Sequence, residues 1–342
     1  MTARLPVLAL VLLTGCLPSS GKRQDQSLLP ADSTSRALAQ SAPADTLRRV
    51  WRAEAPASDA LALPTSLAWL AGGRLAIVDT QAGRVRWLSG AGAFEGGVAF
   101  GADAFPYAAG SAGDTLGVLL RGTGEVAWLA GDAVVRRTPV PGGASAAHLW
   151  QGGVAARLGG GGSGAPAEVV VLGATGRERA RRAIGGPGWR AAGFLTPWGD
   201  SLLALSGYRP VVDVWAPGAT GGALDTLALV GFDSPQLRRS AQFVRGDAAE
   251  PPLLAPSARA LGDRLFVLNA RADELRVDVY GRDGRLERTL VNAGRRGPLE
   301  LVAVDLAVRA GAGAVEIAVL WQRPRGLLRS AGSAVELWRW VP

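Results

Sequence analysis

Short apolar segments and alternating polar–apolar segments follow one another along the chain, separated by glycine-containing turns. Residues 75–78 are an apolar run of strand length, and residues 84–88 alternate polar and apolar side chains. The first pattern is typical of a buried strand and the second of a strand with one covered face. Residues 72–92 therefore predict a turn, a strand, a short polar turn and a second strand.

The alternating strand of this unit recurs along the chain with different residues. Each copy has Val at its second position and bulky apolar residues at its fourth and fifth positions. The six copies are residues 84–88, 125–129, 168–172, 211–215, 276–280 and 334–338. Internal repetition at this spacing is typical of a repeat architecture rather than of one continuous sheet.

Each copy is the third strand of a predicted four-stranded unit. The apolar second strands are residues 75–78, 116–120, 154–158, 202–205, 265–268 and 316–321. The first strands are residues 66–70, 107–109, 146–150, 191–195, 258–261 and 301–308. The fourth strands are residues 97–100, 134–140, 178–184, 224–230 and 286–291, and the sixth unit has none before Pro342.

A spare strand-like segment, residues 47–52, precedes the first unit and supplies the missing strand. Its joining of the last sheet would close a ring and protect strand edges that otherwise invite aggregation. The sequence therefore predicts an all-β fold, a six-bladed β-propeller with four-stranded blades. A seven-bladed ring and a sandwich are the alternatives, and six strand quartets of roughly 49 residues favour six blades.

Two segments link this pattern to a known family. Ile77-Val78-Asp79-Thr80 followed by Arg84-Val85 resembles the core of an NHL-type propeller repeat, and residues 265–269 followed by Arg276-Val277 form a looser copy. The folded region as a whole resembles the six-bladed propeller lipoproteins of bacteria.

The first residues are typical of a targeting segment. Arg4 precedes an apolar stretch, residues 5–13, that is too short to span a bilayer. Residues 13–16, Leu-Thr-Gly-Cys, resemble the bacterial lipobox, which implies cleavage after residue 15 and lipidation of Cys16. A plain secretory signal with a coincidental Cys is the alternative. Because Leu17 follows the Cys, the resemblance favours the outer membrane, with an extracytoplasmic, lipid-anchored protein.

These features divide the chain into three parts. Residues 1–15 are the predicted signal peptide, residues 16–45 the lipidated Cys with a flexible tether, and residues 46–342 the propeller. The tether is rich in Ser, Gln, Asp, Pro and Ala without a periodic pattern.

Charge adds a candidate binding surface. The chain has 37 Lys and Arg against 29 Asp and Glu, a net charge of +8. Many arginines fall in the longer loops predicted on one face of the propeller. They are Arg209, Arg238, Arg239, Arg245, Arg271, Arg295, Arg296, Arg323, Arg325 and Arg329.

Arginine forks suit carboxylates and phosphates, so this face predicts a binding or scaffold module for an anionic ligand, an anionic glycan or a protein partner. The competing interpretation is a solvated charged rim. Secretion disfavours nucleic acid as the partner, and we expect a monomer. Trp321, at the start of one of these loops, could line a ligand site or cap the core, whereas Trp87, Trp128, Trp215 and Trp338 lie on the repeated strands and predict packing between blades.

Residue counts limit the catalytic options. The chain has one His and one Cys, which excludes a zinc cluster built from those residues. A Ser-His-Asp triad would need His148, which falls in an apolar strand, and no G-x-S-x-G motif frames a nucleophile.

One enzymatic alternative comes from the fold family, because six-bladed propellers include sugar-lactone hydrolases that hold a divalent cation with Glu, Asn and Asp. Asn269, Asn292, Glu300 and Asp305 are the candidate ligands here, and oxygen ligands suit Ca²⁺. A structural envelope protein without a small ligand is the remaining alternative. No catalytic residue and no cofactor follow from the favoured binding hypothesis.

Overall fold

The structure is a computed structural model that describes residues 33–159, 166–186, 193–216, 224–271, 274–292, 301–323 and 332–342. The predicted signal peptide, Cys16 and the first part of the predicted tether lie outside these residues.

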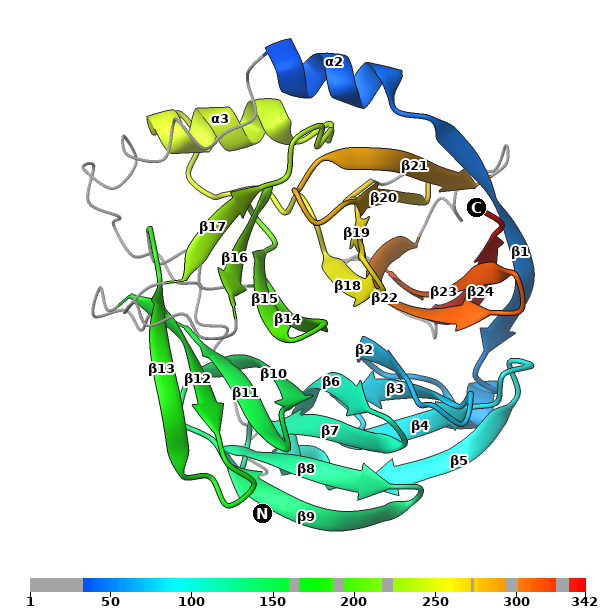
Figure 1. The fold of residues 1–342 in the computed structure, drawn as a ribbon. Helices are drawn as coiled ribbons and strands as arrows, with labels where there is room; N and C mark the ends of the chain where they lie inside the picture. The colour runs from blue at the N-terminus through cyan, green and yellow to red at the C-terminus, as the bar shows by residue number, and fades with distance from the viewer. Residues whose placement is uncertain are drawn as a thin grey trace, which may run out of the picture.

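The described strands form five sheets arranged like the blades of a propeller around a central axis (Figure 1). Four of the sheets have four strands each, and consecutive strands are antiparallel neighbours. The first two are β2 (Pro64–Trp69), β3 (Leu75–Asp79), β4 (Arg84–Leu88) and β5 (Phe94–Ala99), then β6 (Pro106–Ala112), β7 (Thr115–Leu120), β8 (Glu125–Ala130) and β9 (Ala133–Pro139). The next two are β10 (Ala144–Trp150), β11 (Gly153–Leu158), β12 (Ala167–Leu172) and β13 (Glu178–Ile184), then β14 (Gly193–Trp198), β15 (Ser201–Ser206), β16 (Val211–Trp215) and β17 (Asp225–Ala228).

The fifth sheet has eight strands, in the spatial order β18, β19, β20, β21, β1, β24, β23, β22. The bounds are β18 (Ser257–Leu261), β19 (Arg264–Leu268), β20 (Arg276–Tyr280), β21 (Leu286–Asn292), β1 (Ala44–Glu54), β22 (Val302–Gly311), β23 (Ala314–Gln322) and β24 (Ala334–Trp340). This arrangement differs from the six separate blades that the sequence predicts, because β1 joins two expected blades into one sheet.

Strand β1 is long enough to pair twice. Its first residues run parallel to β21, and the stretch from Arg48 onward runs antiparallel to β24, as predicted for an N-terminal strand that completes the last unit. The buried carboxylate of Glu336 on β24 accepts hydrogen bonds from Arg49 at 3.0 Å and from Arg52 at 3.2 Å. These contacts fix the register of β1 on the sheet.

Burial follows the position of each strand in its sheet. Every residue of β3 is buried, and β9 is exposed at all positions except Thr138. Inner strands are covered on both faces by the neighbouring sheets, whereas the outermost strands face solvent. This explains why the inner segments are continuously apolar and the outer ones mix charges with small residues.

The hydrophobic core lies between neighbouring sheets. One cluster joins Trp87 of β4 to Leu116 of β7, and another joins Leu67 of β2 to Leu320 of β23. Trp215 on β16 packs edge to face against Trp150 on β10, with 6.1 Å between the ring centroids. Trp87, Trp215 and Trp338 are buried as predicted for packing between blades, whereas Trp128 is only partly buried against its cluster.

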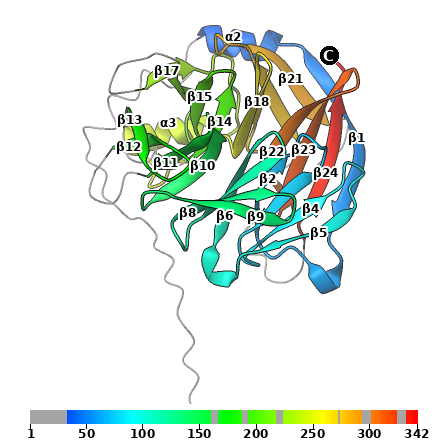
Figure 2. The same cartoon turned by 60° about the horizontal axis from the view of Figure 1, so that its bottom comes forward.

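Two helices lie outside the sheets (Figures 1 and 2). The helix α2 (Ser33–Ser41) falls in the segment expected to be a flexible tether, and Leu38 packs against the core next to β21, so the described part of that segment is ordered on the domain. The helix α3 (Leu237–Arg245) lies in the long connection between β17 and β18. Neither described helix is long and apolar enough to cross a membrane. Two short 3₁₀ turns, η2 (Ala57–Asp59) and η3 (Ala102–Ala104), complete the elements.

Candidate functional site

The innermost strands of the sheets surround a cavity of about 980 Å³, called here the central cavity. Its wall is built from β2, β6, β10, β14, β18 and β22, together with residues that follow β3, β7, β15 and β19 and residues of the α3 connection. Figure 1 shows these six strands facing the centre of the molecule. A single face of the fold thus gathers side chains that are more than 200 residues apart in sequence.

Asp305 lies at the floor of this cavity and is 4% exposed. Its carboxylate accepts hydrogen bonds from the backbone N–H of Leu67 at 2.6 Å and of Leu306 at 2.9 Å. The hydroxyl of Ser257 also donates to it. A register shift between Ala303 and Asp305 in the pairing of β22 with β23 marks an irregularity beside this side chain.

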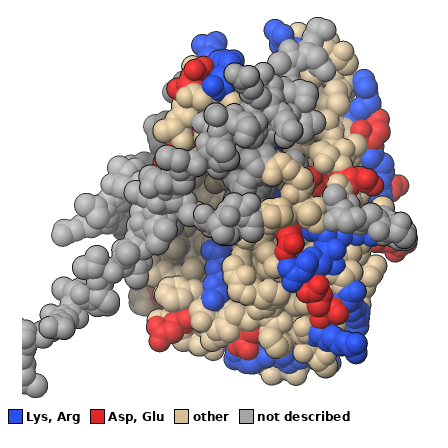
Figure 3. All heavy atoms as spheres, turned by 90° about the vertical axis from the view of Figure 1, so that its left-hand side faces the viewer, with Lys and Arg blue, Asp and Glu red and all other residues tan. Residues whose placement is uncertain are grey.

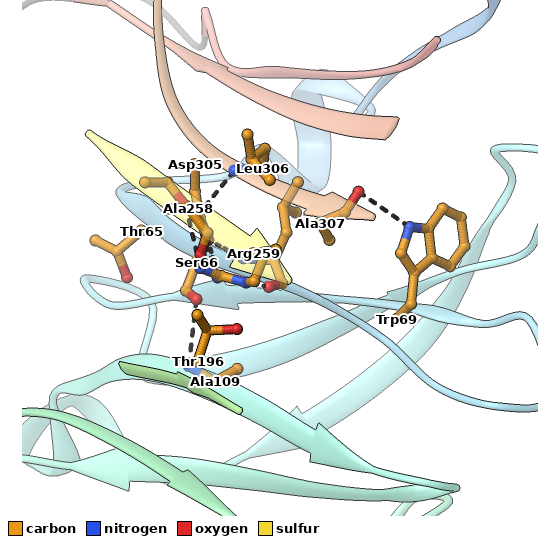
Figure 4. Close-up of polar contacts among 12 residues, drawn as sticks. Thr65, Ser66, Trp69, Ala109, Thr196, Ala258, Arg259, Asp305, Leu306 and Ala307 are labelled. Carbon is orange, nitrogen blue, oxygen red and sulfur yellow. Dashed lines mark hydrogen bonds and ion pairs between the residues drawn. The ribbon is translucent and has the colours of Figure 1, made fainter. Parts of the chain in front are cut away.

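Arg259 on β18 neutralises this carboxylate. One guanidinium nitrogen lies 3.1 Å from Oδ1 and 3.0 Å from Oδ2 of Asp305, and it also donates to the carbonyl oxygen of Leu67 at 3.3 Å. Figure 4 shows Arg259 and Asp305 converging with Ser66 where β18, β22 and β2 meet. Both oxygens of Asp305 are therefore occupied by donors from three strands.

His148 lies on β10, deep in the same layer of the fold, and is 8% exposed. Its Nδ1 donates to the carbonyl oxygen of Leu149 at 2.8 Å. Burial lowers the pKa of His148 to about 4; the hydrogen bond to Leu149 raises the pKa and the positive charge of Arg259 lowers it, and both effects are smaller than that of burial. The imidazole is consequently neutral at physiological pH.

The more exposed part of the cavity, called here the mouth, carries Phe105, Tyr107, Arg121 and Arg239. The guanidinium of Arg121 lies 3.4 Å from the ring centroid of Tyr107 and donates to the carbonyl oxygen of Ser145 at 3.0 Å. Arg239 on α3 forms no ion pair with any residue that the structure describes.

Aromatic side chains face the cavity from two directions. Phe105 and Tyr107 come from the sheet β6–β9, and Phe194 and Tyr208 come from the sheet β14–β17. Burial raises the pKa of Tyr208, and the nearby Tyr107 and Glu250 raise it further. The hydroxyl of Tyr208 therefore stays protonated at neutral pH and can donate a hydrogen bond.

The structure places only part of the predicted arginine face at the cavity. Arg271 lines it and is paired with Asp233 at 3.0 Å and Glu274 at 2.8 Å. Arg209 is 1% exposed, and Arg323, at the end of β23, is not among the lining residues. Trp321 is 2% exposed within the hydrophobic core, so of the two roles considered it caps the core. Arg295, Arg296, Arg325 and Arg329 lie outside the described residues.

The three described members of the candidate Ca²⁺ set occupy different strands or loops. Asp305 lines the cavity, Asn269 follows β19, and Asn292 ends the peripheral strand β21. The amide nitrogen of Asn269 donates to the backbone of Asp233 at 2.6 Å and to Asp278 at 3.0 Å. Glu300 lies outside the described residues, and among those described no three His, Cys, Asp or Glu side chains form a metal-binding group.

Several lining residues were not predicted from the sequence. Arg259 is the charged residue in the first strand Ser257–Leu261, whose other residues are apolar or small, and Asp305 is a charged residue in another first strand. Opposite charges on two inner strands could have indicated this ion pair from the sequence. Phe105 and Tyr107 carry no such signal, because single aromatic residues beside a turn are common on any propeller.

No protein-family model matches the chain, and no curated protein matches it. Solved structures do resemble it. Virginiamycin B lyase from Staphylococcus aureus is 10% identical, with 85% of this chain and 98% of that chain covered and a TM-score of 0.52. The luciferin-regenerating enzyme is 12% identical, with 86% and 94% covered and a TM-score of 0.53. The calcium-binding protein regucalcin from Agrobacterium tumefaciens is 11% identical, with 86% and 95% covered and a TM-score of 0.52. At such identity these similarities support the β-propeller fold alone.

Proposed function

We propose that this protein binds a small anionic molecule in its central cavity. The observation that carries the proposal is the charge of the lining: four arginines, Arg121, Arg239, Arg259 and Arg271, stand against the single carboxylate of Asp305. Arg259 neutralises Asp305, and Arg271 is paired with Asp233 and Glu274. Arg121 and Arg239 are therefore the lining arginines without an ion pair among the described residues, and they favour a negatively charged ligand.

The shape of the site favours a small molecule over a macromolecule. Ligand pockets are concave, largely apolar and roughly 300–1,000 Å³ in volume, and this cavity lies within that range at about 980 Å³. Its apolar wall residues, such as Leu63, Leu195 and Pro256, provide the surface that would cover the uncharged part of a ligand.

The outer surface differs from the cavity in how its charges are matched. On the outer strand β13, Arg181 pairs with Glu178 at 2.8 Å and also with Glu168. Figure 3 views the side of the molecule that β13 and α3 occupy in Figure 1, and basic and acidic side chains lie next to one another there. Basic side chains on this outer surface are thus paired with acidic ones, whereas Arg121 and Arg239 at the cavity have no ion pair among the described residues.

The charge of the ligand can be tested with two matched probes. The dye 1-anilinonaphthalene-8-sulfonate is anionic, and N-phenyl-1-naphthylamine has the same rings without the sulfonate. We expect the folded protein to bind the anionic dye more tightly, and the Arg239→Gln variant to lose about tenfold in its affinity because one charge-assisted contact is removed. Affinity is measured by fluorescence titration at fixed ionic strength.

The matched control is Arg238→Gln, which changes the neighbouring exposed arginine of α3 that does not line the cavity. We expect its affinity for the anionic dye to stay within twofold of the unmodified protein. Equal losses in the two variants, or equal binding of both dyes by the unmodified protein, would reject the proposal.

Two further statements complete the proposal. We propose that the eight-stranded sheet counts as two blades of a six-bladed propeller, supported by the antiparallel order of β18–β21 and of β22–β24 with β1. Slow amide hydrogen exchange along β1, comparable with β24, would be expected of a closing strand.

We also propose that lipidation of Cys16 anchors the protein to the outer membrane, on the resemblance of residues 13–16 to the lipobox. Two or three acyl chains give a stable anchor without a spanning helix. Metabolic labelling with palmitate should mark the full chain and not the Cys16→Ser variant; labelling of both would reject the anchor.

A further inference from the structure

Phe105 has an unusual backbone conformation for a bulky residue. It ends the short turn η3 with φ 45° and ψ 60°, in the left-handed region. The crowding of Cβ disfavours this region for residues other than Gly, Asn and Asp, and residues held there cluster at functional sites. Phe105 also lines the central cavity and is 45% exposed.

The other described non-glycine residue with positive φ has a conformation that its turn requires. Gln151, with φ 48°, sits beside Gly152 in the two-residue connection between β10 and β11. Tight hairpins of that kind require positive φ at both turn positions. Phe105 is not in such a hairpin. It ends the 3₁₀ turn η3, a position where the left-handed conformation is common but is usually adopted by Gly or Asn, so a bulky aromatic residue there is unusual.

Local hydrogen bonds hold Phe105 in place. Its carbonyl oxygen accepts from the backbone N–H of Arg121 at 3.2 Å, and the carbonyl oxygen of Ala104 accepts from Gly122 at 2.9 Å. The strained residue is thus tied to the end of β7, and its exposed ring is kept at the cavity rather than folded into the core.

A second aromatic ring stands two residues along. Tyr107 is 37% exposed, and Arg121 covers one side of its ring at 3.4 Å. Between this pair and Tyr208 on the sheet β14–β17, the wall consists of the small side chains of Ala146 and Ala147 on β10. The cavity is therefore lined by aromatic side chains on two sides and by small side chains between them.

The geometry points to a planar aromatic anion as the ligand, with its ring against Phe105 and Tyr107 and its charge toward the cavity arginines. This inference rests on the proposed function and adds the class of ligand. Exposed aromatic rings favour stacked or edge-on contact with another ring over contact with a saturated ring of the same size. A strained backbone is retained where it presents such a ring.

The test compares two carboxylates of matched size and charge. Naphthalene-2-carboxylate is planar, and decahydronaphthalene-2-carboxylate is its saturated counterpart. By isothermal titration calorimetry on the whole folded protein, we expect the planar acid to bind about three- to tenfold more tightly. Phe105→Gly and Phe105→Leu should both reduce this preference, because each removes one of the two aromatic rings, and Phe105→Leu does so while keeping an apolar side chain.

Stability separates recognition from packing. Because Gly adopts positive φ without strain, Phe105→Gly should unfold at the same temperature as the unmodified protein or higher. A clear fall in the unfolding temperature of this variant would mean that the ring serves packing and would overturn the inference.

The outcomes also separate this inference from the proposed function. Equal binding of the two acids, with both weakened in Arg239→Gln, would overturn the aromatic inference and leave anion binding intact. Binding of either acid that does not change in Arg239→Gln would count against the proposed function itself.

Discussion

The floor and the mouth of the central cavity differ in how completely their polar groups are satisfied. At the floor, the carboxylate of Asp305 accepts hydrogen bonds from two backbone N–H groups, one hydroxyl and one guanidinium. At the mouth, Arg239 has no ion-pair partner among the described residues, and Phe105 is both strained and exposed. A saturated buried network holds strands together, whereas unmatched charge and strain mark the place where a ligand would act.

This difference predicts that floor variants lose stability and that mouth variants lose affinity. The affinity side is tested by Arg239 and Phe105 as described above. The stability side is tested by Asp305 at the floor and by His148, which is buried on β10 and is not among the residues that line the cavity.

The largest effect is expected for Asp305→Ala. The substitution leaves the partly buried guanidinium of Arg259 without its carboxylate and the buried N–H of Leu67 without an acceptor, so we expect a loss of about 3 kcal/mol in the free energy of unfolding. Urea denaturation measures it. The double variant Arg259→Met with Asp305→Ala should recover part of this loss, since no unpaired charge remains.

The opposite result would break the comparison between floor and mouth. If Asp305→Ala stays as stable as the unmodified protein but binds the anionic dye differently, the floor belongs to the binding site. The Arg259–Asp305 pair would then be a contact for the ligand rather than a bond between strands.

The next effect is a pH dependence of stability from His148. Its pKa is about 4 in the folded protein and about 6.5 in the unfolded chain, so the unfolded chain takes up a proton first as the pH falls. Stability should be unaffected above pH 6.5 and should decline between pH 6.5 and pH 4, by about 3 kcal/mol in total.

The matched control for this pH dependence is His148→Asn, whose amide can still donate to the carbonyl oxygen of Leu149. The difference in unfolding free energy between the two proteins, measured by urea denaturation at several pH values, should change with a slope of one proton within that window. Parallel curves would show that His148 is protonated in the folded protein as readily as in the unfolded chain.

Repetition made the strands predictable. The third strands 84–88 and 276–280 are confirmed as β4 and β20. The expectation that such a strand has one covered face is wrong here, because every residue except Arg84 is buried and the polar side chains of Arg86 and Asp278 are buried in ion pairs. The closing strand was also predicted, and it pairs with β24. Its additional pairing with β21 was not predicted, because the sequence pattern does not show that one strand can pair with two neighbouring sheets.

The site was less predictable for physical reasons. Arg259 and Asp305 meet only because the ring brings the first strands of two different units together. The helix α3 lies in a segment expected to be a loop, in which Phe243 and Val244 are apolar among polar residues. The φ angle of Phe105 has no sequence signature, since Gly or Asn would ordinarily mark such a position.

The smallest expected effect concerns Ca²⁺ and tests the hydrolase alternative. A cation at Asp305 would have to displace Arg259, which holds both carboxylate oxygens within 3.1 Å. We therefore expect millimolar Ca²⁺ to change the unfolding temperature by less than about 1 °C. A well-occupied Ca²⁺ site would instead raise it by several degrees. A thermal scan with Ca²⁺ against one with chelator measures this. A rise of several degrees that disappears in Asp305→Asn would make the floor a metal site, and the distinction between a structural floor and a functional mouth would be lost.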